Sequence, residues 1–96
     1  MNIPFTAKLE IADDILFREL DGESVILNMN NENYYGLDEV GTQMWNVLTS
    51  SPSIQFAMEN LLQEYDVPED RLRKDLNALI EQLIDKGMLQ LLDQKG

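Results

Sequence analysis

The chain has 96 residues, seven basic against 18 acidic, for a formal net charge of −11, and it contains neither His nor Cys. These counts allow one small domain and exclude disulfides, thiolate or imidazole zinc sites, cysteine nucleophiles and His-based triads. Carboxylates, hydroxyls and a few Lys remain for chemistry, so we expect a binding protein with no catalytic residue, metal site or cofactor, rather than an enzyme.

The front of the chain has the pattern of strands. Residues 8–11 alternate polar and apolar side chains, which is compatible with a strand or with a loosely attached arm. Two apolar-rich runs, over residues 15–20 and 24–29, flank Asp21 and Gly22, a pair typical of a tight hairpin turn. These runs predict two antiparallel strands.

A third strand is expected after the polar turn at residues 30–33, over the short apolar segment that ends at Leu37. The three strands would form an antiparallel meander. In the middle strand, Val25, Leu27 and Met29 alternate with their neighbours and form a strongly apolar face, which we expect to meet the core.

Three helices follow. Asp38 is a plausible N-cap for a helix to about Leu48, and Ser53 for a second helix whose apolar residues repeat at helical spacing. Pro68 suits the first turn of a third helix, and Gly87 suits the position after its end. Trp45 and the Met residues within these helices are expected in the core.

The expected organisation has three parts. Residues 1–11 form an arm or an extra strand, residues 12–92 form the domain, and residues 93–96 form a tail; residues 88–92 either add a short strand or pack as an extension. No apolar run reaches the length of a membrane span, and the N-terminus lacks the pattern of a signal peptide. We therefore expect a cytoplasmic protein.

The charge is unevenly distributed. Ten of the eleven net negative charges precede residue 68, so the last helix is nearly neutral. It also carries the cluster Arg71, Arg73 and Lys74, which is either a solvated face with Arg71 paired to Asp75 or a patch that receives an anion. The acidic pairs elsewhere match no metal-binding loop and suit helix N-termini instead.

The third strand is the less protected edge of the predicted sheet, since the first strand carries Arg18 and Glu19. It has no charge and no proline, and it contains Gly36. Either it is protected, by its short length or by the last helix covering it, or it is left open so that a partner peptide can add a strand. Tyr34 and Tyr35 must point to opposite faces, so that one packs inward and the other is available to a ligand.

Strands beside a helix-turn-helix pair also describe a winged helix, which makes a DNA-binding regulator an alternative. DNA affinity depends on a basic surface that neutralises phosphates. A chain with a net charge of −11 is repelled by DNA, and three clustered cations offset this only locally.

Four stretches of the chain resemble the PqqD-like family: residues 22–28, 34–45, 61–67 and 86–89. The segment Tyr-Tyr-Gly-Leu-Asp-Glu-Val-Gly at residues 34–41 is the most specific of them. The resemblance implies an α+β, winged-helix-like domain, with a three-stranded antiparallel sheet followed by three helices. It also implies a precursor-peptide recognition element for ribosomally made, post-translationally modified peptides.

In this family the leader segment of the precursor adds as a strand beside the third strand, in a groove next to the third helix. The resemblance therefore implies a peptide-binding site made by both elements, although the three Leu of the helix are equally compatible with the core. The candidate residues are Asn33, Tyr34, Tyr35, Gly36 and Leu37 of the strand, and Arg71, Leu72, Asp75, Leu76 and Leu79 of the helix.

The domain itself would perform no chemistry. It would hold the leader so that a separate enzyme meets its substrate at a high effective concentration. The resemblance favours a leader peptidase of lasso-peptide biosynthesis as that enzyme, with a radical enzyme of pyrroloquinoline-quinone-type biosynthesis as the alternative. Pairing of two copies through the same open edge would give a homodimer.

Overall fold

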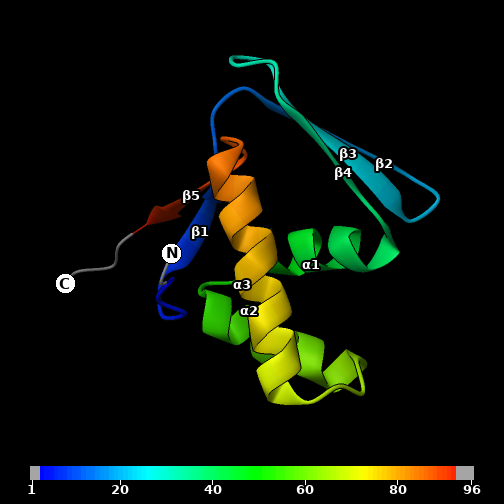
Figure 1. The fold of residues 1–96 in the computed structure, drawn as a ribbon, viewed down its shortest axis with the longest axis vertical. Helices are drawn as coiled ribbons and strands as arrows, with labels where there is room; N and C mark the ends of the chain where they lie inside the picture. Colours follow the sequence, from blue (N-terminus) through cyan, green and yellow to red (C-terminus); the bar gives the residue numbers. More distant parts are fainter. Residues whose placement is uncertain (1–2, 93–96) are drawn as a thin grey trace.

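The structure is a computed structural model that describes residues 3–92 (Figure 1). Strands occupy both ends of the described chain and three helices lie between them. In chain order the elements are β1 (Lys8–Ile11), β2 (Ile15–Leu20), β3 (Glu23–Asn28), β4 (Tyr34–Leu37), α1 (Glu39–Ser50), α2 (Ile54–Glu64), α3 (Glu69–Asp85) and β5 (Leu89–Leu92). The expected α+β fold is confirmed.

The strands form two separate antiparallel sheets. One is the predicted meander, in the order β2-β3-β4, and its first turn has positive φ angles of 55° at Asp21 and 85° at Gly22, as a type I′ hairpin requires. The other pairs β1 with β5, with Leu9 opposite Leu91. Both ambiguous segments, residues 8–11 and 88–92, therefore contain strands, whereas the expected tail at residues 93–96 lies outside the described residues.

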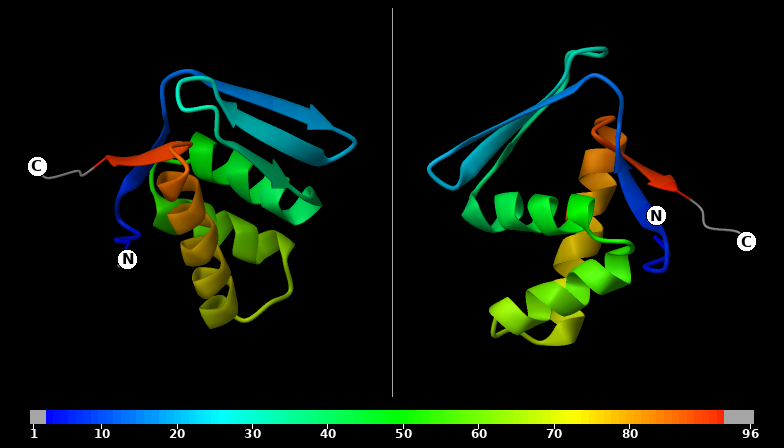
Figure 2. Two further views of the ribbon diagram at one scale, coloured as in Figure 1. Left: turned by 45° about the horizontal axis from the view of Figure 1, so that its top comes forward. Right: turned by 180° about the vertical axis from the view of Figure 1, so that it is seen from behind.

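The two sheets lie on opposite sides of the C-terminal end of α3 (Figure 2). The chain before β1 also contacts the helices, because the carbonyl oxygens of Phe5 and Ala7 accept hydrogen bonds from the backbone N–H groups of Gln55 and Ile54 at 2.7 and 3.0 Å. These donors belong to the first turn of α2, where no partner exists within the helix. The segment before β1 is thus tied to α2.

The helix boundaries follow the predicted caps. The carboxylate of Asp38 accepts a hydrogen bond from the N–H of Gly41 at 2.8 Å, and the hydroxyl of Ser53 accepts one from the N–H of Phe56 at 3.1 Å. Gly87 follows the C-cap of α3 with a φ of 77°, a conformation that favours glycine. No helix in the described part of the chain is both long and apolar enough to cross a bilayer.

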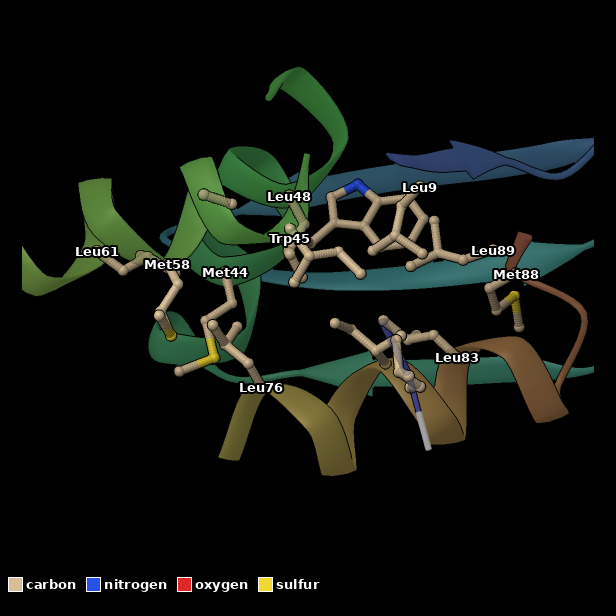
Figure 3. Packing of buried hydrophobic residues seen from close by; sticks show 14 of the residues in the cluster. Leu9, Met44, Trp45, Leu48, Met58, Leu61, Leu76, Leu83, Met88 and Leu89 are labelled. Carbon is tan, nitrogen blue, oxygen red and sulfur yellow. The ribbon is translucent and has the colours of Figure 1, made fainter. Parts of the chain in front are cut away.

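The core lies where the three helices meet the inner faces of the sheets. Side chains from α1, α2 and α3 point toward one another, and Leu9 and Leu89 close the core on the side of the second sheet (Figure 3). Trp45 is buried and stacks on the ring of Phe17 from β2, with the ring centroids 5.6 Å apart. The expectation that Trp45 belongs to the core is confirmed.

The face of β3 that packs inward is the opposite of the predicted one. Val25 and Met29 are 50% and 59% exposed and Leu27 is half-buried, whereas Ile26 is fully buried. Hydrophobicity alone assigns the wrong face here, because the inner face carries polar residues beside Ile26 whose hydrogen-bonding groups all find partners inside the protein.

Ser24 and Asn28 are these two inner residues. The hydroxyl of Ser24 shares a buried hydrogen bond of 2.8 Å with the hydroxyl of Thr42 on α1, and Asn28 bonds to the end of α3. Since each polar group has a partner, its burial carries no large penalty. The apolar side chains of Val25 and Met29 are left on the outer face of the sheet.

The Ser24–Thr42 pair gives a prediction about stability. Thr42→Val leaves the buried hydroxyl of Ser24 without its partner, and we expect a loss of about 1–3 kcal/mol in the free energy of unfolding. Adding Ser24→Ala removes the orphaned group and should recover part of that loss. Urea unfolding of the two single variants and the double variant measures the coupling, and additive losses would contradict a direct bond.

Candidate functional site

The outer edge of β4 is open. β3 pairs with β4 on one side, and no described strand pairs with it on the other. The N–H of Asn28 donates to the carbonyl of Asn33 at 2.9 Å, which places residue 33 in a hydrogen-bonded pair of the ladder. Because such pairs alternate in antiparallel sheets, Tyr35 also faces β3, and the backbone groups of Tyr34 and Gly36 face outward.

A shallow hollow of about 410 Å³ lies along this edge. One wall is the end of α3, and the two elements are joined by a hydrogen bond from the Tyr35 hydroxyl to the side-chain carbonyl of Gln82. The hollow is lined by Glu32, Asn33, Tyr34, Tyr35, Gly36 and Lys86. It combines outward backbone groups, an aromatic ring and one cation.

β4 and α3 run antiparallel beside this hollow. Asn33 contacts Lys86 and Tyr35 contacts Gln82. An advance of two residues along the strand therefore corresponds to four residues in the reverse direction along the helix. The distances agree, since two strand residues rise about 6.6 Å and four helix residues rise about 6 Å. From this point the two elements diverge (Figure 1).

The structure places the predicted strand residues at one edge, in three different environments. Tyr34 is 71% exposed on the outer face of the sheet, and Gly36 has open space where a side chain would begin. Tyr35 is half-buried against the core, as expected for the neighbour of an exposed Tyr34. Leu37 is buried, so it contributes backbone rather than side chain to this edge.

The predicted helix residues are not all brought to the site. Leu72 and Leu76 are core residues, 2% and 0% exposed, and offer a bound peptide almost no surface, which agrees with the core alternative. Leu79 is half-buried against the core. Asp75 and Arg71 are exposed, but Arg71 lies about 22 Å along the helix from Lys86, beyond the roughly 13 Å that residues 33–37 span.

Gln82 and Lys86 belong to the helix wall, and the sequence-based prediction missed both. They continue the stripe of Asp75 and Leu79 at helical spacing, i, i+4, i+7 and i+11. Extending the candidate stripe to the C-terminal end of the third helix would have found them.

The ion pair between Arg71 and Asp75, one of the two alternatives for the basic cluster, is not formed. Among the described residues the ion pair is Arg73–Glu69, at 3.4 Å, and the Arg73 guanidinium also lies 4.8 Å from the ring centroid of Phe5. Arg73 thus contacts the segment that precedes β1. This leaves Arg71 and Lys74 as a small exposed basic patch at the start of α3.

The chemistry available at the hollow is that of recognition. Outward N–H and C=O groups at alternate residues can bond an extended backbone, and the exposed ring of Tyr34 can contact its side chains. Within residues 3–92 no cluster of three carboxylates is arranged to hold a metal ion. The geometry suits an extended peptide.

Comparisons with known proteins agree in fold. The chain superimposes on "TbiB1 in Complex with the TbiA(beta) Leader Peptide" with a TM-score of 0.78 and 27% identity, covering 84% of this chain and 94% of the other. It superimposes on "Lasso peptide synthetase B1 complexed with the leader peptide" with a TM-score of 0.77 and 23% identity, over 88% and 99% of the chains. It also matches 12% of "the heterocyclase TruD", with a TM-score of 0.62 and 16% identity over 94% of this chain.

These three structures are described as two peptide complexes and a heterocyclase, so none of them supports the DNA-binding alternative. The search of curated proteins finds no match. Residues 23–89, more than half of the chain, match the family model described as "Coenzyme PQQ synthesis protein D (PqqD)", and they include both walls of the hollow. The chain therefore belongs to the PqqD family.

Proposed function

We propose that this protein binds the leader segment of a ribosomally made precursor peptide and presents it to a separate enzyme, without performing chemistry itself. The leader adds as a fourth strand to the three-stranded sheet, antiparallel or parallel to β4. Main-chain hydrogen bonds supply much of the affinity, and side chains that line the hollow select the sequence.

The open edge of β4 is the observation that carries this proposal. Tyr34 and Gly36 direct their backbone groups away from β3, toward a hollow walled by α3. An open edge of this kind can pair with any extended chain whose side chains fit beside it. Proteins usually protect such edges for this reason. The leader-bound state of the relatives TbiB1 and lasso peptide synthetase B1 gives the natural occupant by analogy.

Presentation to an enzyme needs a second surface, and the outer face of the sheet offers one. Leu16, Val25 and Met29 are exposed there, beside Tyr34. A peptide strand added to β4 would extend this face, so that peptide and apolar side chains lie on one continuous surface. We propose that the partner enzyme recognises this combined surface, which forms only when the leader is bound.

Lasso-peptide biosynthesis is the pathway that the relatives favour, with a leader peptidase as the partner. Quinone-cofactor biosynthesis, with a radical enzyme as the partner, is the second candidate, and the description of the family model favours it. We propose the cytoplasm as the place of action, because ribosomally made precursors are first available there.

Direct binding tests the proposal. The leader encoded by the precursor gene nearest to this gene should bind the fluorescently labelled protein in a saturable, one-to-one manner. A scrambled version of the leader should not bind. Duplex DNA serves as the control that tests the DNA-binding alternative. Equal binding of native and scrambled leaders, or binding of neither, would contradict leader recognition.

The same edge also suits a second copy of the chain. Two copies that each carry a charge of −11 repel one another, which opposes pairing at low ionic strength. Sedimentation velocity at several salt concentrations measures this, and leader binding should dissociate any dimer formed through β4.

A further inference from the structure

The turn between β3 and β4 is bonded to the end of α3 by three asparagine side chains. The amide of Asn28 donates to the carbonyl of Gly87 at 2.8 Å, and the amides of Asn31 and Asn33 donate to the carbonyl of Lys86 at 3.4 and 3.3 Å. Carbonyls at the end of a helix have no partners within the helix, so these bonds also cap α3. We call Asn28, Asn31 and Asn33 the amide clamp.

Asn28 is the centre of the amide clamp. Its side-chain oxygen accepts hydrogen bonds from the backbone N–H groups of Asn30 and Asn31, at 2.8 and 3.1 Å, while its nitrogen reaches α3. One side chain therefore shapes the turn and joins it to the helix. It is 5% exposed and does not line the hollow, so it is not placed to touch a bound peptide.

The amide clamp packs closely against Gly87, the residue that follows the C-cap of α3. A Cβ at Gly87 would lie 2.8 Å from the amide nitrogen of Asn31, closer than Cβ atoms approach, and 3.0 Å from that of Asn28, so that both amides would have to move. Gly87 thus serves two needs, a positive φ and the close approach of the two amides. The end of α3 and the start of β4 are held at a fixed separation.

That separation sets the width of the hollow where Lys86 and Asn33 line it. Lys86 and Asn33 line the hollow and are also bonded to one another, and among residues 3–92 the Tyr35–Gln82 bond is the only hydrogen bond that joins the two walls further along. We propose that Asn28 is a positioning residue for peptide binding, which presets the spacing of β4 and α3 before the leader arrives. This inference rests on the proposed function.

A preset groove removes an ordering cost from binding. Without the clamp the free protein spends part of its time with the walls apart, and the apparent dissociation constant rises by the inverse of the fraction that remains competent. The bound state itself is unchanged, because Asn28 makes no contact with the peptide. If Asn28 only stabilised the fold, its substitution would cause no such loss of affinity in the protein that remains folded.

Two substitutions at Asn28 and one control test this. Asn28→Asp keeps the oxygen that accepts from the turn but loses the donor to Gly87, and Asn28→Ala loses both. The control is Leu61→Ala, in the core on α2, which lowers stability without touching the clamp or the hollow. All are measured by urea unfolding, by leader affinity and by amide spectra of free and saturated protein.

We expect both Asn28 variants to lose about tenfold in affinity, as for a competent fraction of about one tenth, and Leu61→Ala to lose less than about twofold. The free Asn28 variants should show shifted amides in residues 34–37, and their saturated complexes should match the wild-type complex there. Wild-type affinity in the Asn28 variants, or an equal loss in Leu61→Ala, would overturn the positioning role. Failure of the wild type to bind would instead overturn the proposed function.

Discussion

Gly36→Pro is expected to abolish leader binding while leaving the domain folded. Proline removes one N–H and places its ring where that hydrogen stood. At residue 36 that N–H points away from β3, so the ladder inside the sheet is kept and the fourth strand is blocked. We expect affinity to fall by about 100-fold or more, from a lost hydrogen bond, an orphaned peptide carbonyl and a steric clash.

Gly36→Ala is the matched control. A Cβ at this position meets no atom within 4 Å, and alanine keeps the N–H. The variant should fold at least as well as the wild type and bind the leader within about twofold, since Gly→Ala at a compatible position costs little. Circular dichroism and urea unfolding establish the fold of both variants. Unchanged affinity in Gly36→Pro would mean that the peptide does not add to β4.

Leu76→Ala is expected to have the largest effect on stability. Leu76 is fully buried in the middle of α3, where it faces side chains of the other two helices (Figure 3). Removal of a buried Leu side chain costs about 2–5 kcal/mol. A domain of this length has a free energy of unfolding of about 5–14 kcal/mol, so the variant should lose a large part of its stability.

The same variant tests whether Leu76 belongs to the groove. As a core residue it should leave the leader affinity of the folded fraction within about twofold of the wild type. Leu79→Ala should behave in the opposite way, with a smaller loss of stability and a loss of about 1 kcal/mol, or about fivefold, in affinity. Urea unfolding and peptide titration measure both. A large loss of affinity in Leu76→Ala, measured where the variant is fully folded, would mean that Leu76 contacts the bound peptide.

Most of the helices and strands could be predicted from turn and capping residues that act on their neighbours in the sequence. Asp21-Gly22 requires a hairpin, Asp38 and Ser53 cap their helices through one oxygen each, and Gly87 takes a φ that other residues avoid. Each signal depends only on residues close in sequence. The same holds for β4, whose lack of charge and proline indicates an open edge.

What the sequence could not supply depends on contacts between distant residues. The buried face of β3 was predicted wrongly, because Ser24 and Asn28 become acceptable in the core only through partners on α1 and at the end of α3. The helix wall was predicted incompletely for a similar reason. Periodicity groups Leu76 with Leu79, and only packing against the other elements leaves Leu76 fully buried and Leu79 half-buried.

Hydrogen exchange at β4 tests strand addition most directly. In the free protein the N–H groups of Tyr34 and Gly36 face the hollow, while those of Tyr35 and Leu37 bond to β3. On saturation with the leader, exchange at Tyr34 and Gly36 should slow by about 100-fold or more, with a much smaller change at Tyr35 and Leu37. A saturated complex in which Tyr34 and Gly36 exchange as fast as in the free protein would contradict the account.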